Sequence, residues 1–254
     1  MLKRFRSWRR QRLLRRHAID NDLWHRVCRA LPVLHRLDRG ELSRLREQAT
    51  LFVATKQFFG THGLTVTDTM RVAVAAQAAL PVLNLGEQYY AGWSSVVLYE
   101  GAFRTRHQHA DEAGVVHTVE NTQIGEAWTD GPLVLSWHDA ARPAPFGEGT
   151  NVVIHECAHK LDMLSGAANG RPALHPDMDA DGWARDLSAA YGVLVRELAE
   201  DRPPPFDPYA GESPAEFFAV MSEYFFALPQ ALQRHFPAVY GHLARFYRQD
   251  PARL

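Results

Sequence analysis

Hydrophobic residues recur at helical spacing over most of the chain. Apolar positions lie three or four residues apart through residues 18–60, and Trp183, Leu187 and Tyr191 repeat this spacing after a polar loop. Cap residues, prolines and glycines bound further helical segments at residues 69–79, 150–164, 213–227 and 239–248. The pattern therefore predicts a mainly helical protein.

A few short segments have the composition of strands instead. Residues 95–99, 115–119 and 132–137 are rich in β-branched, leucine and aromatic side chains. All three lie between helical regions rather than alternating with single helices. We therefore expect the α+β class, with one small sheet inside a helical domain.

Composition excludes several classes of protein. Hydrophobic residues make up 46% and charged residues 22% of the 254 positions, which is typical of a globular domain and not of a disordered chain. The two cysteines, Cys28 and Cys157, lack the spacing of a disulfide framework or a zinc knuckle, so a reducing cytoplasm is expected. The most apolar stretch, residues 72–85, is too short and interrupted to span a membrane.

The net charge of −1 hides a basic N-terminus. Residues 1–16 hold eight lysines and arginines and no acid, which leaves 20 basic against 29 acidic residues in the remainder, a net charge of −9. We expect a flexible basic tail at residues 1–17 and a single domain at residues 18–254. A solvated terminus is the favoured interpretation, and contact with nucleic acid or anionic lipid is the alternative.

The segment that carries the chemistry reads His155-Glu156-Cys157-Ala158-His159, an H-E-x-x-H pattern on an apolar helix. Two histidines four residues apart are offset by only about 40° around the helix axis, so both imidazoles can bind one zinc ion. Glu156 can then hold a water molecule and accept its proton. The alternative, two surface histidines beside an ordinary glutamate, fits poorly with the apolar residues around them.

A catalytic zinc usually has a third protein ligand, and three acidic residues compete for this role. Asp162 lies seven residues after His155, about 10 Å along the helix axis, which is too far for its short side chain to reach the same ion easily. We therefore expect Asp162 to have a structural role or to hydrogen-bond to a metal ligand. Glu216 and Glu223 share one face of a later helix, and either can ligate while the other orients a histidine. Glu216 also occupies the capping-box position after Ser213, which is its purely structural alternative. Spacing alone does not decide whether Glu216 or Glu223 is the third ligand.

Two long motifs resemble one known family. The stretches NVVIHECAHKLDM at residues 151–163 and SPAEFFAVMSEYFF at residues 213–226 are similar to the Mlc titration factor A family, also called the DgsA anti-repressor family of zinc metallopeptidases of the gluzincin type. The resemblance runs from about residue 20 to residue 251. It implies a zincin-like metallopeptidase domain with a small sheet beside the HExxH helix, and one zinc ion held by His155, His159 and Glu216, with Glu156 as the acid/base.

The resemblance also implies how the site would act. The family is locally similar to the catalytic domain of anthrax lethal factor, where a tyrosine seven residues before the third ligand stabilises the oxyanion, and Tyr209 has this position. The alternative for Tyr209 is a loop aromatic that covers the core. We expect a zinc-dependent peptidase, aminopeptidase-like or acting on short peptides. Its substrate would extend along a sheet edge at residues 94–103 or 132–137.

Two other functions follow from other features. The family is known for sequestering the glucose-responsive repressor Mlc, so the rival interpretation is a regulatory protein that binds a repressor and holds zinc for structure. A complete HExxH motif favours the enzyme, because a binding module needs no general base. Nucleic-acid or membrane association through the basic N-terminus is the third interpretation. The histidines His107, His109, His117 and His138 are interpreted as polar surface and left outside the site.

Overall fold

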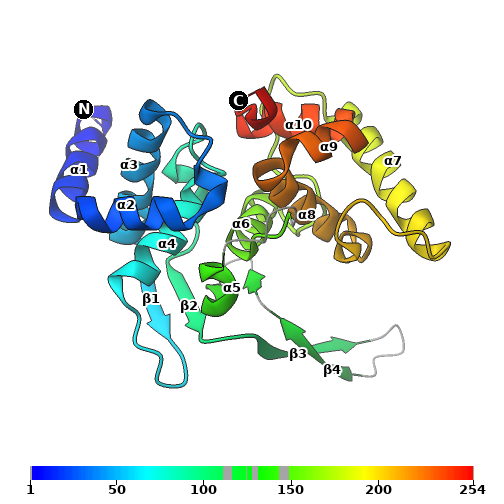
Figure 1. The fold of residues 1–254 in the computed structure, drawn as a ribbon, viewed down its shortest axis with the longest axis horizontal. Coiled ribbons are helices and arrows are strands. Elements are labelled where there is room, and N and C mark those ends of the chain that lie inside the picture. Colours follow the sequence, from blue (N-terminus) through cyan, green and yellow to red (C-terminus); the bar gives the residue numbers. More distant parts are fainter. Residues whose placement is uncertain (1, 111–115, 124, 128–130, 143–148, 254) are drawn as a thin grey trace.

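The computed structural model describes residues 2–110, 116–123, 125–127, 131–142 and 149–253 (Figure 1). In these residues the helices are α1 (Leu2–Arg16), α2 (Asn21–Ala30), α3 (Arg39–Thr55), α4 (Asp68–Ala79), α5 (Trp137–Ala141), α6 (Val152–Asp162), α7 (Ala180–Ala199), α8 (Pro214–Ala227), α9 (Pro229–His235) and α10 (Pro237–Tyr247). The strands are β1 (Gln57–Gly60), β2 (Ser95–Tyr99), β3 (Phe103–Ala110), β4 (Val116–Gln123), β5 (Gly125–Ala127) and β6 (Leu133–Ser136). The α+β class is confirmed.

A small sheet has the strand order β1-β2-β6-β5. The strands β1, β2 and β6 run parallel, whereas β5 pairs antiparallel with β6 and forms one edge. The central strands are buried, with Val96, Leu98, Leu133 and Leu135 fully inside the core. The strands β3 and β4 form a separate antiparallel hairpin that extends away from the helices (Figure 1).

The helix α6 lies in the middle of the molecule. Figure 1 shows α1 to α4 on one side of it and α7 to α10 on the other. Every residue of α6 is buried, and one continuous hydrophobic core joins it to α4 and α8. Because α6 has no exposed face, any polar side chain on it must find a partner inside the protein.

Most of the expected elements are present near their expected bounds. The helices expected at residues 69–79, 150–164, 213–227 and 239–248 correspond to α4, α6, α8 and α10, and two expected strands correspond to β2 and β6. The third, at residues 115–119, falls within β4 from Val116, and residue 115 lies outside the described residues. The short strand β1 and the helix α9 were not expected.

The basic N-terminal segment, expected as a flexible tail at residues 1–17, forms the helix α1 in the structure. Arginine and leucine are good helix formers, and α1 packs beside α3. The guanidinium of Arg10 donates to Glu47 over 2.8 Å and lies 3.7 Å from Glu87. The acidic body thus provides partners for part of the basic charge, although Arg9, Arg12, Arg15 and Arg16 stay exposed.

None of the helices in the described ranges is long and apolar enough to cross a membrane.

Candidate metal centre

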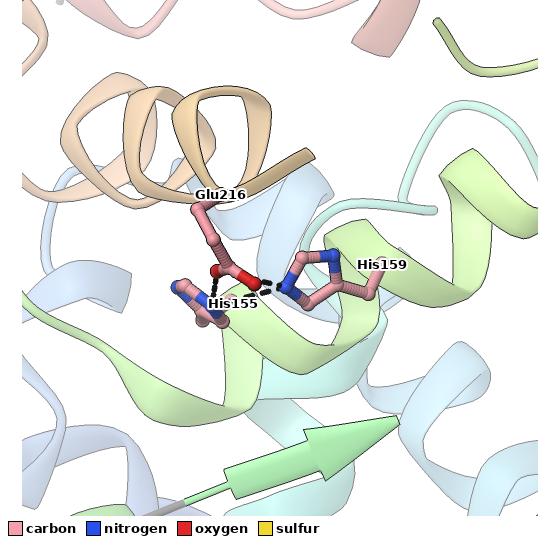
Figure 2. Close-up of side chains that lie close together, drawn as sticks. All are labelled: His155, His159 and Glu216. Carbon is pink, nitrogen blue, oxygen red and sulfur yellow. Dashed lines mark hydrogen bonds and ion pairs between the residues drawn. The ribbon is translucent and has the colours of Figure 1, made fainter. Parts of the chain in front are cut away.

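The helix α6 brings His155 and His159 together one turn apart. Asn151 caps the helix by accepting the N–H of Ile154 over 3.0 Å, and its amide donates to Gln77 of α4 over 2.8 Å, which fixes the start of the helix. The Nε2 atoms of the two histidines lie 3.2 Å apart, and both side chains are buried (Figure 2). Two imidazoles therefore converge on one point.

Glu216 reaches the same point from the first turn of α8. The hydroxyl of Ser213 accepts the N–H of Glu216 over 3.2 Å, so Ser213 is the cap of α8. The carboxylate of Glu216 points to the histidines, with Oε2 at 3.0 Å from Nε2 of His155 and 3.2 Å from Nε2 of His159 (Figure 2). Glu216 therefore faces the histidines and does not serve as a capping-box side chain.

The triangle formed by these three atoms has the size of a metal site. Ligands bound to a tetrahedral zinc at about 2.0–2.1 Å lie about 3.3 Å from one another. The observed edges are 3.2, 3.0 and 3.2 Å. Among the described residues, this is the one group of three histidine, cysteine or acidic side chains arranged to hold an ion. The donor set of two imidazoles and one carboxylate fits zinc.

Glu223 lies two turns further along α8 than Glu216 and supports the cluster through hydrogen bonds. Its Oε1 lies 2.7 Å from Nδ1 of His155, and its Oε2 accepts the backbone N–H of Asn151. With Nδ1 of His155 donating to Glu223, the other ring nitrogen, Nε2, faces Glu216 and His159, where it would bind a metal ion. Asn151, which links Glu223 to the start of α6, was not singled out from the sequence, although an asparagine before an apolar helical run is a cap signal.

Asp162 lies at the far end of α6, outside the triangle. Its Oδ2 accepts the N–H groups of Asn169 and Gly170 over 2.8 and 2.7 Å. Gly170 has a positive φ of 79° and lies against Pro214, where a Cβ atom would clash with the backbone. Asp162 therefore ties the loop after α6 to the start of α8. Its Oδ1 and the Nδ1 of His159 are both buried without a partner among the described residues.

Asp162→Ala is expected to destabilise the fold by about 2–6 kcal/mol, because two loop N–H groups lose their acceptor and each costs about 1–3 kcal/mol when left unpaired. The measurement is urea denaturation followed by circular dichroism. Asp181→Ala, an exposed change in the first turn of α7, serves as the control and should shift the free energy of unfolding by less than about 0.5 kcal/mol. Equal stability of the two variants would contradict the role of Asp162.

The charges of the cluster favour a bound cation. Burial lowers the pKa of His155, but hydrogen bonds to Glu216 and Glu223 outweigh burial and raise this pKa well above its usual range. Burial raises the pKa of Glu216, but hydrogen bonds from His155 and His159 outweigh it and lower the pKa to about 2. The cluster thus keeps Glu216 ionised and favours positive charge between the three side chains, as a divalent ion would supply.

Glu156 lies beside the triangle with one oxygen unoccupied. Its Oε2 is buried and has no hydrogen-bond partner in the described part of the chain. Burial raises the pKa of Glu156 to about 7. A carboxylate with a pKa near neutrality can both accept and release a proton, which is what a general acid/base requires.

Tyr209 approaches the cluster from the short 3₁₀ helix η4 (Pro208–Gly211), which packs against α8. Its ring lies 5.9 Å from the ring of His155, centroid to centroid, and its side chain is 40% exposed. Partial burial and the carboxylate of Glu216 raise the pKa of Tyr209, so the phenol keeps its proton. The ring therefore borders the site with one side open to solvent.

The sheet edge near the site differs from the expected one. Both expected segments, residues 94–103 and 132–137, contain interior strands, because β2 lies between β1 and β6, and β6 lies between β2 and β5. The edge strand that contacts α6 is β5. A three-residue strand carries too little hydrophobic pattern to be recognised in a sequence.

Of the four histidines left outside the site, His138 is the one whose side chain is described. His138 is exposed and lies 3.7 Å from Asp139. His107, His109 and His117 belong to the hairpin β3–β4, whose side chains lie outside the described residues.

Comparison with known proteins agrees with the metal cluster. The family described as glucose-regulated metallo-peptidase M90 matches residues 5–248, so the match includes most of the basic helix α1, which was not expected to be part of the family pattern. The chain is 40% identical over 235 residues to proteins named Mlc titration factor A from Yersinia pestis (strain Pestoides F) and Yersinia pseudotuberculosis (serotype O:1b, strain IP 31758), covering 91% of this chain and 86% of each relative. The chain therefore belongs to the family of glucose-regulated M90 metallo-peptidases.

Proposed function

We propose that the protein is a zinc-dependent peptidase whose metal ligands are His155, His159 and Glu216. The observation that carries the proposal is the buried triangle of two imidazole nitrogens and one carboxylate oxygen, with Glu156 beside it, whose Oε2 has no partner among the described residues. A zinc that only stabilised the fold would need no such group. The arrangement therefore supports catalysis.

Each side chain has a separate task in the proposed reaction. Zinc, when bound, supplies a Lewis acid that polarises the scissile carbonyl and lowers the pKa of water. Glu156 accepts the proton of the attacking water and then delivers it to the nitrogen of the leaving amine. Glu223 holds Nδ1 of His155, so that the ring keeps its orientation throughout.

Tyr209 and β5 complete the proposed site. Tyr209 borders the cluster in its protonated form, so its hydroxyl can donate to the oxygen that becomes negative when water adds to the carbonyl. The strand β5 contacts α6 and lies at the edge of the sheet, where no further strand of the described residues pairs with it and an extended peptide can add. The substrate would then lie between β5 and the metal ligands.

Removal and return of the metal tests the proposed function. We expect about one zinc per chain by elemental analysis, and we expect hydrolysis of a mixed peptide library to stop after treatment with a chelator and to recover when zinc is added. The melting temperature should fall on chelation, because a ligand bound only to the folded state stabilises it. Peptide hydrolysis that persists in the metal-free protein would contradict the proposal.

A second candidate function is binding of a transcriptional repressor of the Mlc type in the cytoplasm. Its support is the name shared by the relatives at 40% identity, Mlc titration factor A. The test is gel filtration of the zinc-loaded and metal-free protein with a purified Mlc-type repressor. Binding by both forms together with absence of hydrolysis would favour the regulatory function over the peptidase.

A further inference from the structure

A cavity lies between the loop held by Asp162, the helix α7 and the first turn of α8. Its volume is about 260 Å³. Its walls include Trp183, Leu187 and Tyr191 of α7, Pro214 and Phe217 of α8, and Arg171 of the loop after α6. Phe217 directly follows the ligand Glu216, and Gly170 beside Arg171 is bound to Asp162 of α6. The helix α8, which carries the ligand Glu216, thus borders this cavity, and the loop held by Asp162 forms part of its wall.

The wall is mainly apolar and rigid. Trp183 and Phe217 are almost fully buried, the indole N–H of Trp183 donates to the carbonyl of Gly170 over 3.0 Å, and the hydroxyl of Tyr191 donates to Gly211 over 3.0 Å. The polar groups of these aromatic residues are therefore already used within the protein. The accessible apolar surface of the cavity comes from Tyr191 and Pro214, with a smaller share from Leu187, and it suits an aliphatic or aromatic side chain.

Arg171 is the one positively charged residue among the described residues of the cavity wall. Its backbone N–H donates to Asn169 over 3.0 Å and its carbonyl accepts from Ser165, which hold the residue in place. Its side chain is exposed, and among the described residues no carboxylate lies within ion-pair distance of its guanidinium. A guanidinium at the rim of an apolar cavity is complementary to a carboxylate attached to an apolar group.

We propose that this cavity binds the C-terminal residue of a short peptide, with its apolar side chain against Leu187, Tyr191 and Pro214 and its α-carboxylate on Arg171. The volume falls just below the range of about 300–1,000 Å³ that is usual for drug-sized ligands, so it suits a single residue. The proposal takes its ligand class from the proposed peptidase function. It narrows the substrates to short peptides with a free, apolar C-terminus.

The test measures peptide binding without hydrolysis. The zinc-loaded Glu156→Gln protein is titrated by calorimetry with alanyl-alanyl-phenylalanine and with its C-terminal amide. We expect the acid to bind about tenfold more tightly than the amide, and Arg171→Gln to abolish this difference, because a charge-assisted hydrogen bond is lost. Arg185→Gln, an exposed change on α7 outside the cavity wall, is the matched control and should preserve the difference.

A further variant tests the apolar part of the cavity. Ser188 lies exposed at the cavity rim, so Ser188→Trp can occupy the space without disturbing the core, and its melting temperature shows whether the fold is kept. This variant is expected to lose affinity for the acid and the amide alike. Equal binding of acid and amide, a preference that survives Arg171→Gln, or undiminished binding to Ser188→Trp would each overturn the proposal.

The peptide-binding test of the cavity and the hydrolysis test of the proposed peptidase can fail independently of each other. Hydrolysis of amidated peptides by the wild-type protein tests the peptidase without using the Arg171 contact. Hydrolysis of these amides with no preference for the acid in the binding test would reject the cavity and keep the peptidase. An Arg171-dependent preference with no hydrolysis of any peptide would keep the cavity and reject the peptidase.

Discussion

Glu156→Gln is expected to keep the bound zinc and to lose peptide hydrolysis by about 10²–10⁴-fold, the usual contribution of a general acid/base. The amide has the shape of the carboxylate but cannot accept a proton from water. Glu156 lies beside the triangle of His155, His159 and Glu216 and is not one of its three members. Zinc content by elemental analysis should therefore stay near the wild-type value while kcat falls.

The variant Glu197→Gln is a matched control for this change. Glu197 is a partly buried glutamate of α7 whose Oε2, like that of Glu156, has no partner among the described residues. The same chemical change there should leave both zinc content and hydrolysis unaltered. Wild-type activity in Glu156→Gln would mean that another group removes the proton of the attacking water.

The parts of the fold that could be predicted are those that rest on local signals. The helix α6 combines a helical apolar pattern with an asparagine cap, and α8 begins with Ser213 and Pro214, a cap residue followed by proline at the first helical position. The pair His155 and His159 could be found for the same reason, because a spacing of four residues on a helix places both rings on one side.

Other features depend on contacts between distant segments. Glu216 and Glu223 share one helix face, so spacing cannot tell which of them meets both Nε2 atoms; that depends on how α8 crosses α6. The edge position of β5 depends on strand pairing that three residues do not encode. The packing of α1 beside α3, with Arg10 close to Glu47 and Glu87, also joins residues that are far apart in the chain.

Glu216→Ala should weaken zinc binding by more than about 100-fold, because it removes a metal ligand. Loss of a residue that only hydrogen-bonds to a ligand lowers metal affinity by roughly 10–100-fold. The helix start should survive, because the backbone N–H at position 216 can still donate to Ser213. His155→Ala and His159→Ala should lose zinc to a similar extent. The measurement is competition with a chelating dye of known zinc affinity, with circular dichroism to show that each variant is folded.

Two further variants, at Ser213 and Glu223, show whether Glu216 binds the metal, caps the helix, or only holds a metal ligand in place through a hydrogen bond. Ser213→Ala removes the cap alone, so it should cost about 0.5–2 kcal/mol of stability and leave zinc affinity unchanged. Glu223→Ala should weaken zinc binding by roughly 10–100-fold, because Nδ1 of His155 loses its carboxylate partner while all three ligands remain. If Glu216→Ala binds zinc as tightly as Ser213→Ala while Glu223→Ala loses it, the ligand on α8 is Glu223, and the carboxylate of Glu216 only neutralises the two imidazoles in the absence of metal.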